Sequence, residues 1–273
     1  MSIQSEIYLA QQKISDEEIN SWVDTFHSQG YLFLENVLPP QWCKELRDDL
    51  DKALEEDRSN NEDGEERDKT WGYLQYAMFE KSKANLRLFD LEPIVSFAEA
   101  LIAKNCHVIH NNSFKTLPGG GIMDWHQDDA PHFIVKDGPV PSNVHLPVLF
   151  FTANYYLTDV TSLENGATEV IPGSHLFGQA AQGNLEGTKW EDQIHSNLGK
   201  AGSVVLFNNQ TWHRGGPNIS DETRYITQIT YGRRIIGHKY YPFMNYQMPE
   251  HIYKDASPRL KRLLGFLPHG TYG

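Results

Sequence analysis

The chain has 273 residues, of which 39% are hydrophobic and 22% charged, and its formal net charge at pH 7 is −12. The length suits one domain (residues 1–273), since β-sandwiches and barrels commonly reach roughly 200–250 residues. The negative charge argues against a nucleic-acid partner and disfavours a highly anionic substrate, because phosphate binding requires lysine and arginine. No apolar run approaches the ~20 residues of a membrane helix, and no apolar segment follows a basic start. With only Cys43 and Cys106, we expect a cytoplasmic protein without a disulfide framework, not bound to a membrane.

The first part of the chain, about 14–104, is predicted to be mainly helical. A helix should start at Ser15, which begins a capping-box sequence, and end at Gly30. An apolar strand is expected at 31–34, a second helix after Pro40 and a third at 86–104. Residues 55–69 are almost all polar or charged, which is typical of a solvated loop. The alternative is a lid over an active site, since long loops in compact domains are often functional.

From Cys106 onward the pattern changes to short β-rich runs separated by Gly, Pro, Asn and Asp. The main candidate strands are 108–114, 123–128, 148–157, 168–171, 203–207 and 225–231. Such strands indicate a sandwich or barrel, and a jelly roll suits a metal site between two sheets. We therefore predict a mainly β (α+β) fold. Its double-stranded β-helix core, cupin-like, should span about 106–235, and a helical tail should span about 250–273, with a helix at 254–264.

The clearest chemical signal is the pair His126 and Asp128, followed far along the chain by His213. Residues two apart on a strand project from the same face, so the imidazole and the carboxylate of the pair can enter one space. A histidine from a distant strand would complete a 2-His-1-carboxylate site, which holds non-haem Fe(II) and leaves one side open. Arg224 begins a later predicted strand and could clamp a carboxylate. Asp129 should face away from this site.

In order and spacing these residues resemble the phytanoyl-CoA dioxygenase-like branch of the Fe(II)/2-oxoglutarate oxygenases, and the resemblance covers most of the chain. Further shared segments are 30–34, 165–166, 171–175, 202–207 and 216–218. The resemblance implies Fe(II) held by His126, Asp128 and His213, and 2-oxoglutarate held by Arg224. The charge of the site agrees with 2-oxoglutarate as cosubstrate. Fe(II), one carboxylate and one guanidinium sum to two positive charges, which this dianion neutralises. Halogenating relatives have a small residue at the position of Asp128, so hydroxylation or a related oxidation of a small organic substrate with O2 is expected.

The resemblance also implies further contacts to 2-oxoglutarate. Asn112 lies on the strand before the metal pair, and Phe151 stands about where the family often has an aromatic, although core packing is the alternative for Phe151. Family members frequently have a serine two positions after the distal histidine, where this chain has Gly215. Thr227 or Thr230 could supply the missing hydroxyl.

Trp125, Gln127 and the loop 131–145 border the predicted pocket, so they are the predicted substrate contacts. Two other functions remain open from the sequence. A non-catalytic jelly roll could bind a small ligand, with the histidines serving the structure. A zinc-dependent hydrolase could use the same three ligands, as open zinc sites often do, but Arg224 would then be idle.

Overall fold

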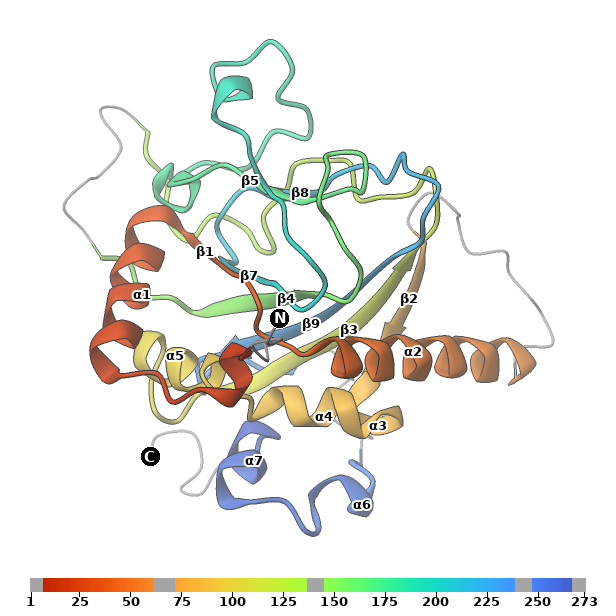
Figure 1. The fold of residues 1–273 in the computed structure, drawn as a ribbon. Coiled ribbons are helices and arrows are strands. Elements are labelled where there is room, and N and C mark those ends of the chain that lie inside the picture. The colour runs from red at the N-terminus through yellow and green to blue at the C-terminus, as the bar shows by residue number, and fades with distance from the viewer. Residues whose placement is uncertain (1–6, 61–71, 137–144, 239–246, 267–273) are drawn as a thin grey trace, which may run out of the picture.

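The computed structural model describes residues 7–60, 72–136, 145–238 and 247–266. Two antiparallel sheets face each other, with strand orders β1-β7-β4-β9-β3-β2 and β6-β5-β8 (Figure 1). The large sheet contains β1 (Tyr31–Leu34), β2 (Tyr73–Tyr76), β3 (His107–Thr116), β4 (Phe150–Tyr156), β7 (Val204–Asn208) and β9 (Arg224–Gly232). The small sheet contains β5 (Thr168–Val170), β6 (His195–Asn197) and β8 (His213–Gly215). This is the arrangement of the predicted jelly roll.

Helices cover the face of the large sheet that points away from the small sheet (Figure 1). They are α1 (Asp16–Gln29), α2 (Pro40–Asn60), α3 (Met78–Lys81), α4 (Lys83–Phe89), α5 (Ile94–Leu101), α6 (Glu250–Tyr253) and α7 (Pro258–Leu263). Short 3-10 helices occur at η1 (Leu9–Gln11), η2 (Ser174–Leu176) and η3 (Glu191–Gln193). No helix in the described ranges has the length and apolar character that a bilayer crossing requires.

The predicted start of α1 at Ser15 is confirmed, with Ser15 as its N-cap residue. The Ser15 side chain accepts a hydrogen bond of 3.2 Å from the backbone N–H of Glu18. The helix ends at Gly30, whose φ of 77° is in the left-handed region. A Cβ at this position would lie 2.4 Å from Nδ1 of His175, so only glycine fits the turn into β1.

The two faces of the large sheet differ because side chains alternate along each strand. On the helix side, Phe151 of β4 packs against Phe26 of α1 and Phe97 of α5, with ring centroids 5.7 Å and 5.4 Å apart. Ile229 and Tyr231 of β9 are fully buried in the same cluster. The opposite side of the same strands carries polar side chains and faces the small sheet.

Several predicted boundaries differ from the structure. The helix predicted at 86–104 is two helices, α4 and α5, because Pro93 interrupts it: proline has no N–H and disfavours helical geometry in the preceding residue. The tail helix predicted at 254–264 is shorter, since α7 starts at Pro258 and ends at Leu263, and a separate short helix, α6, precedes the predicted range. The predicted loop 55–69 is wrong in its first part, since α2 continues to Asn60, and 61–69 lie outside the described residues.

Two further differences concern strands. The mainly helical first part also supplies β1 and β2 to the large sheet, of which only β1 was predicted. The strand expected at 123–128 is reduced to one isolated bridge between His126 and His213. The segment is nevertheless extended enough to place alternate side chains on opposite sides.

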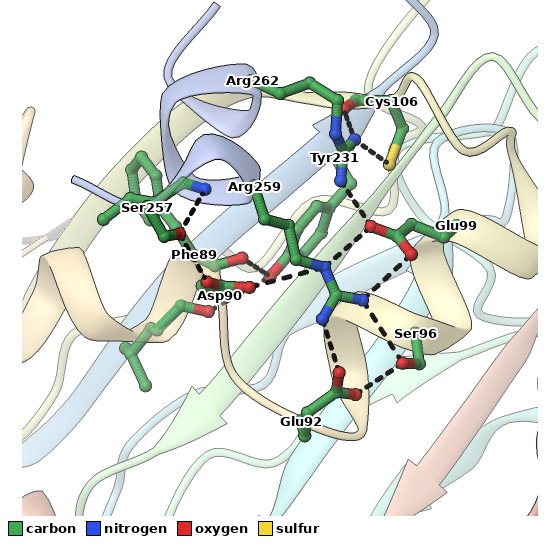
Figure 2. A network of polar contacts seen from close by, with 12 residues as sticks. Phe89, Asp90, Glu92, Ser96, Glu99, Cys106, Tyr231, Ser257, Arg259 and Arg262 are labelled. Carbon is green, nitrogen blue, oxygen red and sulfur yellow. Dashed lines mark hydrogen bonds and ion pairs between the residues drawn. The ribbon is translucent and has the colours of Figure 1, made fainter. Parts of the chain in front are cut away.

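Ion pairs fasten α7 to the body of the protein (Figure 2). The guanidinium of Arg259 lies 2.6 Å from a carboxylate oxygen of Glu92 and 2.8 Å from one of Glu99. Arg262 also pairs with Glu99. These contacts tie the C-terminal helix to α5 and to the turn before it. They lie on the helix side of the large sheet (Figure 1).

Candidate metal centre and cavity

His126, Asp128 and His213 converge as the sequence predicts. One ligand atom from each lies within 4.8 Å of the others. The backbones of His126 and His213 exchange hydrogen bonds of 3.0 Å and 2.9 Å, so pairing of the chain brings the two imidazoles together. Their ring centroids are 4.3 Å apart, and Nε2 of His213 lies 3.7 Å from Oδ1 of Asp128. Three donors thus meet at one point.

Both imidazoles are oriented by the backbone. Nδ1 of His126 donates to the carbonyl of Asp124 at 2.9 Å, and Nδ1 of His213 donates to the carbonyl of Thr211 at 2.9 Å. Because a carbonyl oxygen only accepts, each Nδ1 carries the proton and each Nε2 is left with a lone pair. This is the tautomer that metal-binding histidines adopt. The donor set therefore fits a divalent transition metal with an open side.

Arg224 lies in the same cavity as the triad and is 6% exposed. Its Nη1 donates to the carbonyls of Gly166 and Gly216, and Nη2 lies 3.4 Å from the hydroxyl of Thr116. Its Nε is buried without a partner. No carboxylate of the described chain pairs with it, and burial lowers the pKa of Arg224 to about 10. A buried cation without a counter-ion is costly, so the site calls for an anionic ligand.

The cavity has a volume of about 210 Å³ and lies between the two sheets. Its charged lining residues among those described are Asp128, Arg214 and Arg224. Arg214 is neutralised by Glu169 at 2.6 Å, which leaves Arg224 as the unpaired cation. The other lining residues are His110, Asn112, Phe114, Thr116, Ile122, His126, Thr152, Asn154, Thr168, Phe207, His213, Gly215, Ile226, Gln228 and Thr230.

The predicted 2-oxoglutarate contacts have different outcomes. Asn112 lines the cavity, and its Oδ1 is buried without a partner. The prediction for Phe151 is wrong, because its ring is packed against the helices on the other face of the sheet. Strand alternation places its neighbours Thr152 and Asn154 in the cavity instead.

The structure places Trp125 and Gln127, the predicted substrate contacts, outside the lining of the cavity. The alternation that aligns His126 with Asp128 turns the residues between and beside them away. Trp125 is buried in a separate apolar cluster with Trp212, and Gln127 donates to the backbone of Asp129 at 2.8 Å. Neither side chain lines the cavity. Of the loop 131–145, residues 137–144 lie outside the described residues.

The hydroxyl beside Arg224 comes from a residue that the sequence reasoning missed. Thr116 of β3 is directly opposite Arg224 of β9 and lines the cavity. Thr227 faces the other side of the sheet, where it bonds to Ser113 at 2.8 Å. Thr230 lines the cavity. Thr116 and Asn112 are four residues apart on the same strand, and residues an even number of positions apart face the same side. The sequence therefore indicates that Thr116 faces the same space as Asn112.

Comparison with known proteins identifies a family and several relatives. Residues 26–226 match the profile of the family described as phytanoyl-CoA dioxygenase (PhyH). The chain is 23% identical over 225 residues to the ectoine dioxygenase of Nocardia farcinica (strain IFM 10152), covering 72% of each protein. It is 29% identical over 118 residues to the iron/alpha-ketoglutarate-dependent dioxygenase ausO of Aspergillus calidoustus, covering 42% of this chain and 38% of that protein. The match with dioxygenase peniF of Penicillium patulum covers 50% of that protein, so these two fungal relatives are matched over half of their length or less.

Solved structures show the same fold. HygX from Streptomyces hygroscopicus, solved with nickel and 2-oxoglutarate bound, superposes with a TM-score of 0.62 at 14% identity, covering 83% of this chain and 89% of that one. The alpha-ketoglutarate-dependent carbocyclase SnoK from nogalamycin biosynthesis gives 0.58 at 19% identity, covering 84% and 88%. The predicted jelly-roll architecture is thereby confirmed.

Proposed function

The chain belongs to the phytanoyl-CoA dioxygenase (PhyH) family, and on this premise we propose that it is an Fe(II)- and 2-oxoglutarate-dependent dioxygenase acting on a small organic molecule. One observation carries the proposal: a 2-His-1-carboxylate cluster shares a cavity with a buried guanidinium that has no counter-ion. The dioxygenase names of several relatives support it. The free, buried Cys43 and Cys106 suit the cytoplasmic location that we also propose.

Each side chain of the site has a defined role in this proposal. Nε2 of His126, Nε2 of His213 and the carboxylate of Asp128 would hold Fe(II). Arg224 would receive the distal carboxylate of 2-oxoglutarate through two parallel hydrogen bonds, with the hydroxyl of Thr116 beside it. When bound, Fe(II) and 2-oxoglutarate would supply oxidative decarboxylation to succinate and CO2, coupled to oxidation of the substrate by O2.

The cavity walls assist by excluding water. Phe114, Phe207 and Ile226 line the cavity with apolar side chains, which offer no hydrogen bonds to solvent. Phe207 also packs against His213, with ring centroids 4.3 Å apart, which restricts the ring orientation of this ligand. Because Asp128 fills the carboxylate position, we propose hydroxylation or a related oxidation rather than halogenation.

Arg224 separates this proposal from the two alternatives. A zinc hydrolase needs the three ligands but has no use for a buried cation that awaits a dianion. A non-catalytic binding protein has no need for two imidazoles that both present Nε2 to one point. The arrangement is accounted for as a whole by a metal and a 2-oxo diacid.

The test is succinate formation from 2-oxoglutarate under air, together with the Fe(II) content of anaerobically loaded protein. His126→Ala and Asp128→Ala should each abolish succinate formation and lower the iron content. Asp129→Ala is the matched control, since its carboxylate bonds to the backbone of Ala130 outside the cavity and should be dispensable. Unchanged succinate formation in the first two variants would refute the assignment. Stoichiometric zinc with no response to 2-oxoglutarate would favour the hydrolase.

A further inference from the structure

The cavity has two chemically different ends. Antiparallel pairing sets the cavity-facing side chains in rows across the sheet: Arg224 lies opposite Thr116, and Thr230 lies opposite both His110 and Thr152. Arg224 and Thr230 stand six residues apart on β9, which corresponds to roughly 20 Å along the strand. The cationic row and the hydroxyl row are therefore at opposite ends.

The metal ligands lie toward the hydroxyl row. The ring of His213 contacts Phe207, which is the cross-strand partner of Thr152. Two residues further along β8, Gly215 lies near the other end, where a Cβ would be 3.5 Å from Nη2 of Arg224. A diacid that reaches from Arg224 to the metal therefore fills the cationic end. The hydroxyl row remains for the substrate.

Besides the imidazole of His110, this row offers the uncharged hydroxyls of Thr152 and Thr230. The hydroxyls of Thr152 and Thr230 are 3.0 Å apart and buried. Two hydroxyls carry two donors and four lone pairs, and their mutual bond uses one of each. One donor and three lone pairs stay available. The adjoining row adds the carboxamides of Asn154 and Gln228. These two residues are register partners on β4 and β9.

Apart from the metal site and the imidazole of His110, the described residues at this end include no group that would pair with a charged substrate. Among the charged residues that line the cavity, Asp128 belongs to the metal cluster, Arg214 is paired with Glu169, and Arg224 lies at the other end. A phosphate or carboxylate that bound here away from the metal would be desolvated without an unpaired lysine or arginine beside it. A hydrocarbon would cover the hydroxyl pair and leave its free donor unsatisfied.

We propose that the part of the substrate that reaches the metal is an uncharged, hydroxyl-bearing carbon framework, bound by Thr152, Thr230 and Gln228. This inference rests on the proposed dioxygenase function. It names the substrate class and makes the threonine pair its specificity determinant. An acyl-CoA thioester does not belong to this class.

Binding without turnover can be tested by saturation-transfer NMR. The protein is loaded with 2-oxoglutarate and with Zn(II), which is diamagnetic and redox-inert, in place of iron. The probes are neutral polyols (myo-inositol, glucose and sorbitol), the anion cyclohexanecarboxylate, and palmitoyl-CoA. The variant is the double substitution Thr152→Val with Thr230→Val, which keeps shape and removes both partners of the buried bond. Thr227→Val is the control on the same strand, facing away from the cavity.

At least one polyol should bind better than both anionic probes, and the double variant should weaken its binding by about tenfold. The Thr227→Val control should not weaken it. Tighter binding of palmitoyl-CoA or cyclohexanecarboxylate, binding of no polyol, or equal polyol binding in the double variant would each overturn the proposal. Failure of the proposed function would show differently, as protein to which 2-oxoglutarate itself does not bind.

Discussion

Replacing Arg224 with Gln should separate affinity for 2-oxoglutarate from the stability of the protein. Losing one partner of a buried charge pair costs about 3–5 kcal/mol, so the Kd for 2-oxoglutarate should rise about 100-fold or more. The free protein should respond differently, because its guanidinium is buried without a counter-ion and its pKa is lowered to about 10. At about 1.4 kcal/mol per pKa unit, removing that charge relieves about 3 kcal/mol. The two lost charged hydrogen bonds to the carbonyls of Gly166 and Gly216, at about 1.5 kcal/mol each, cost about 3 kcal/mol together and so offset this relief.

We therefore expect the free energy of unfolding without ligand to change by no more than about 1–2 kcal/mol. Calorimetric titration of 2-oxoglutarate into Mn(II)-loaded protein under nitrogen measures the Kd, and urea unfolding measures stability. Arg214→Gln is the matched control, since Arg214 lines the same cavity but is paired with Glu169 at 2.6 Å. The reasoning fails if Arg224→Gln leaves the Kd unchanged, or if both variants weaken binding equally.

Three further predictions concern the scaffold. Burial lowers the pKa of His107 to about 4, so between pH 6.5 and 4 the unfolded chain binds a proton that the folded chain does not. Stability should therefore fall by about 2–3 kcal/mol as pH drops from 7 to 4.5, and His107→Gln should reduce this slope in urea unfolding. Phe151→Ala should lower stability by about 3–5 kcal/mol, yet leave the Kd for 2-oxoglutarate unchanged where the protein remains folded. Arg259→Gln should cost about 1–2 kcal/mol, and less at high salt, because its ion pairs are partly exposed.

Each of these has an outcome that contradicts it. An acid slope identical in His107→Gln would show that other groups cause it. A Kd raised by Phe151→Leu, which keeps an apolar side chain in the core, would place that residue at the cosubstrate after all. A loss in Arg259→Gln that does not depend on salt would mean that packing of the side chain, rather than its ion pairs, fastens α7.

Local sequence determined the features that depend on near neighbours. The helix N-cap at Ser15 and the turn at Gly30 follow from a few adjacent residues, and the structure has both. Likewise, His126 and Asp128 share one side because side chains alternate along any extended chain. The order of the site residues along the chain was enough to indicate the family, since each ligand occupies its own place in the motif.

Only the tertiary structure decided which face of each strand meets the cavity. Every residue of β4 is buried, because helices cover one face and the small sheet encloses the other, so no polar-apolar alternation marks the cavity side. This pattern does not distinguish Phe151 from Thr152, and the structure places Thr152 in the cavity and Phe151 in the core. The pairing of Thr116 with Arg224 and the missing counter-ion of Arg224 likewise depend on strand register and on distant residues. Register is a long-range property, and short segments do not encode it.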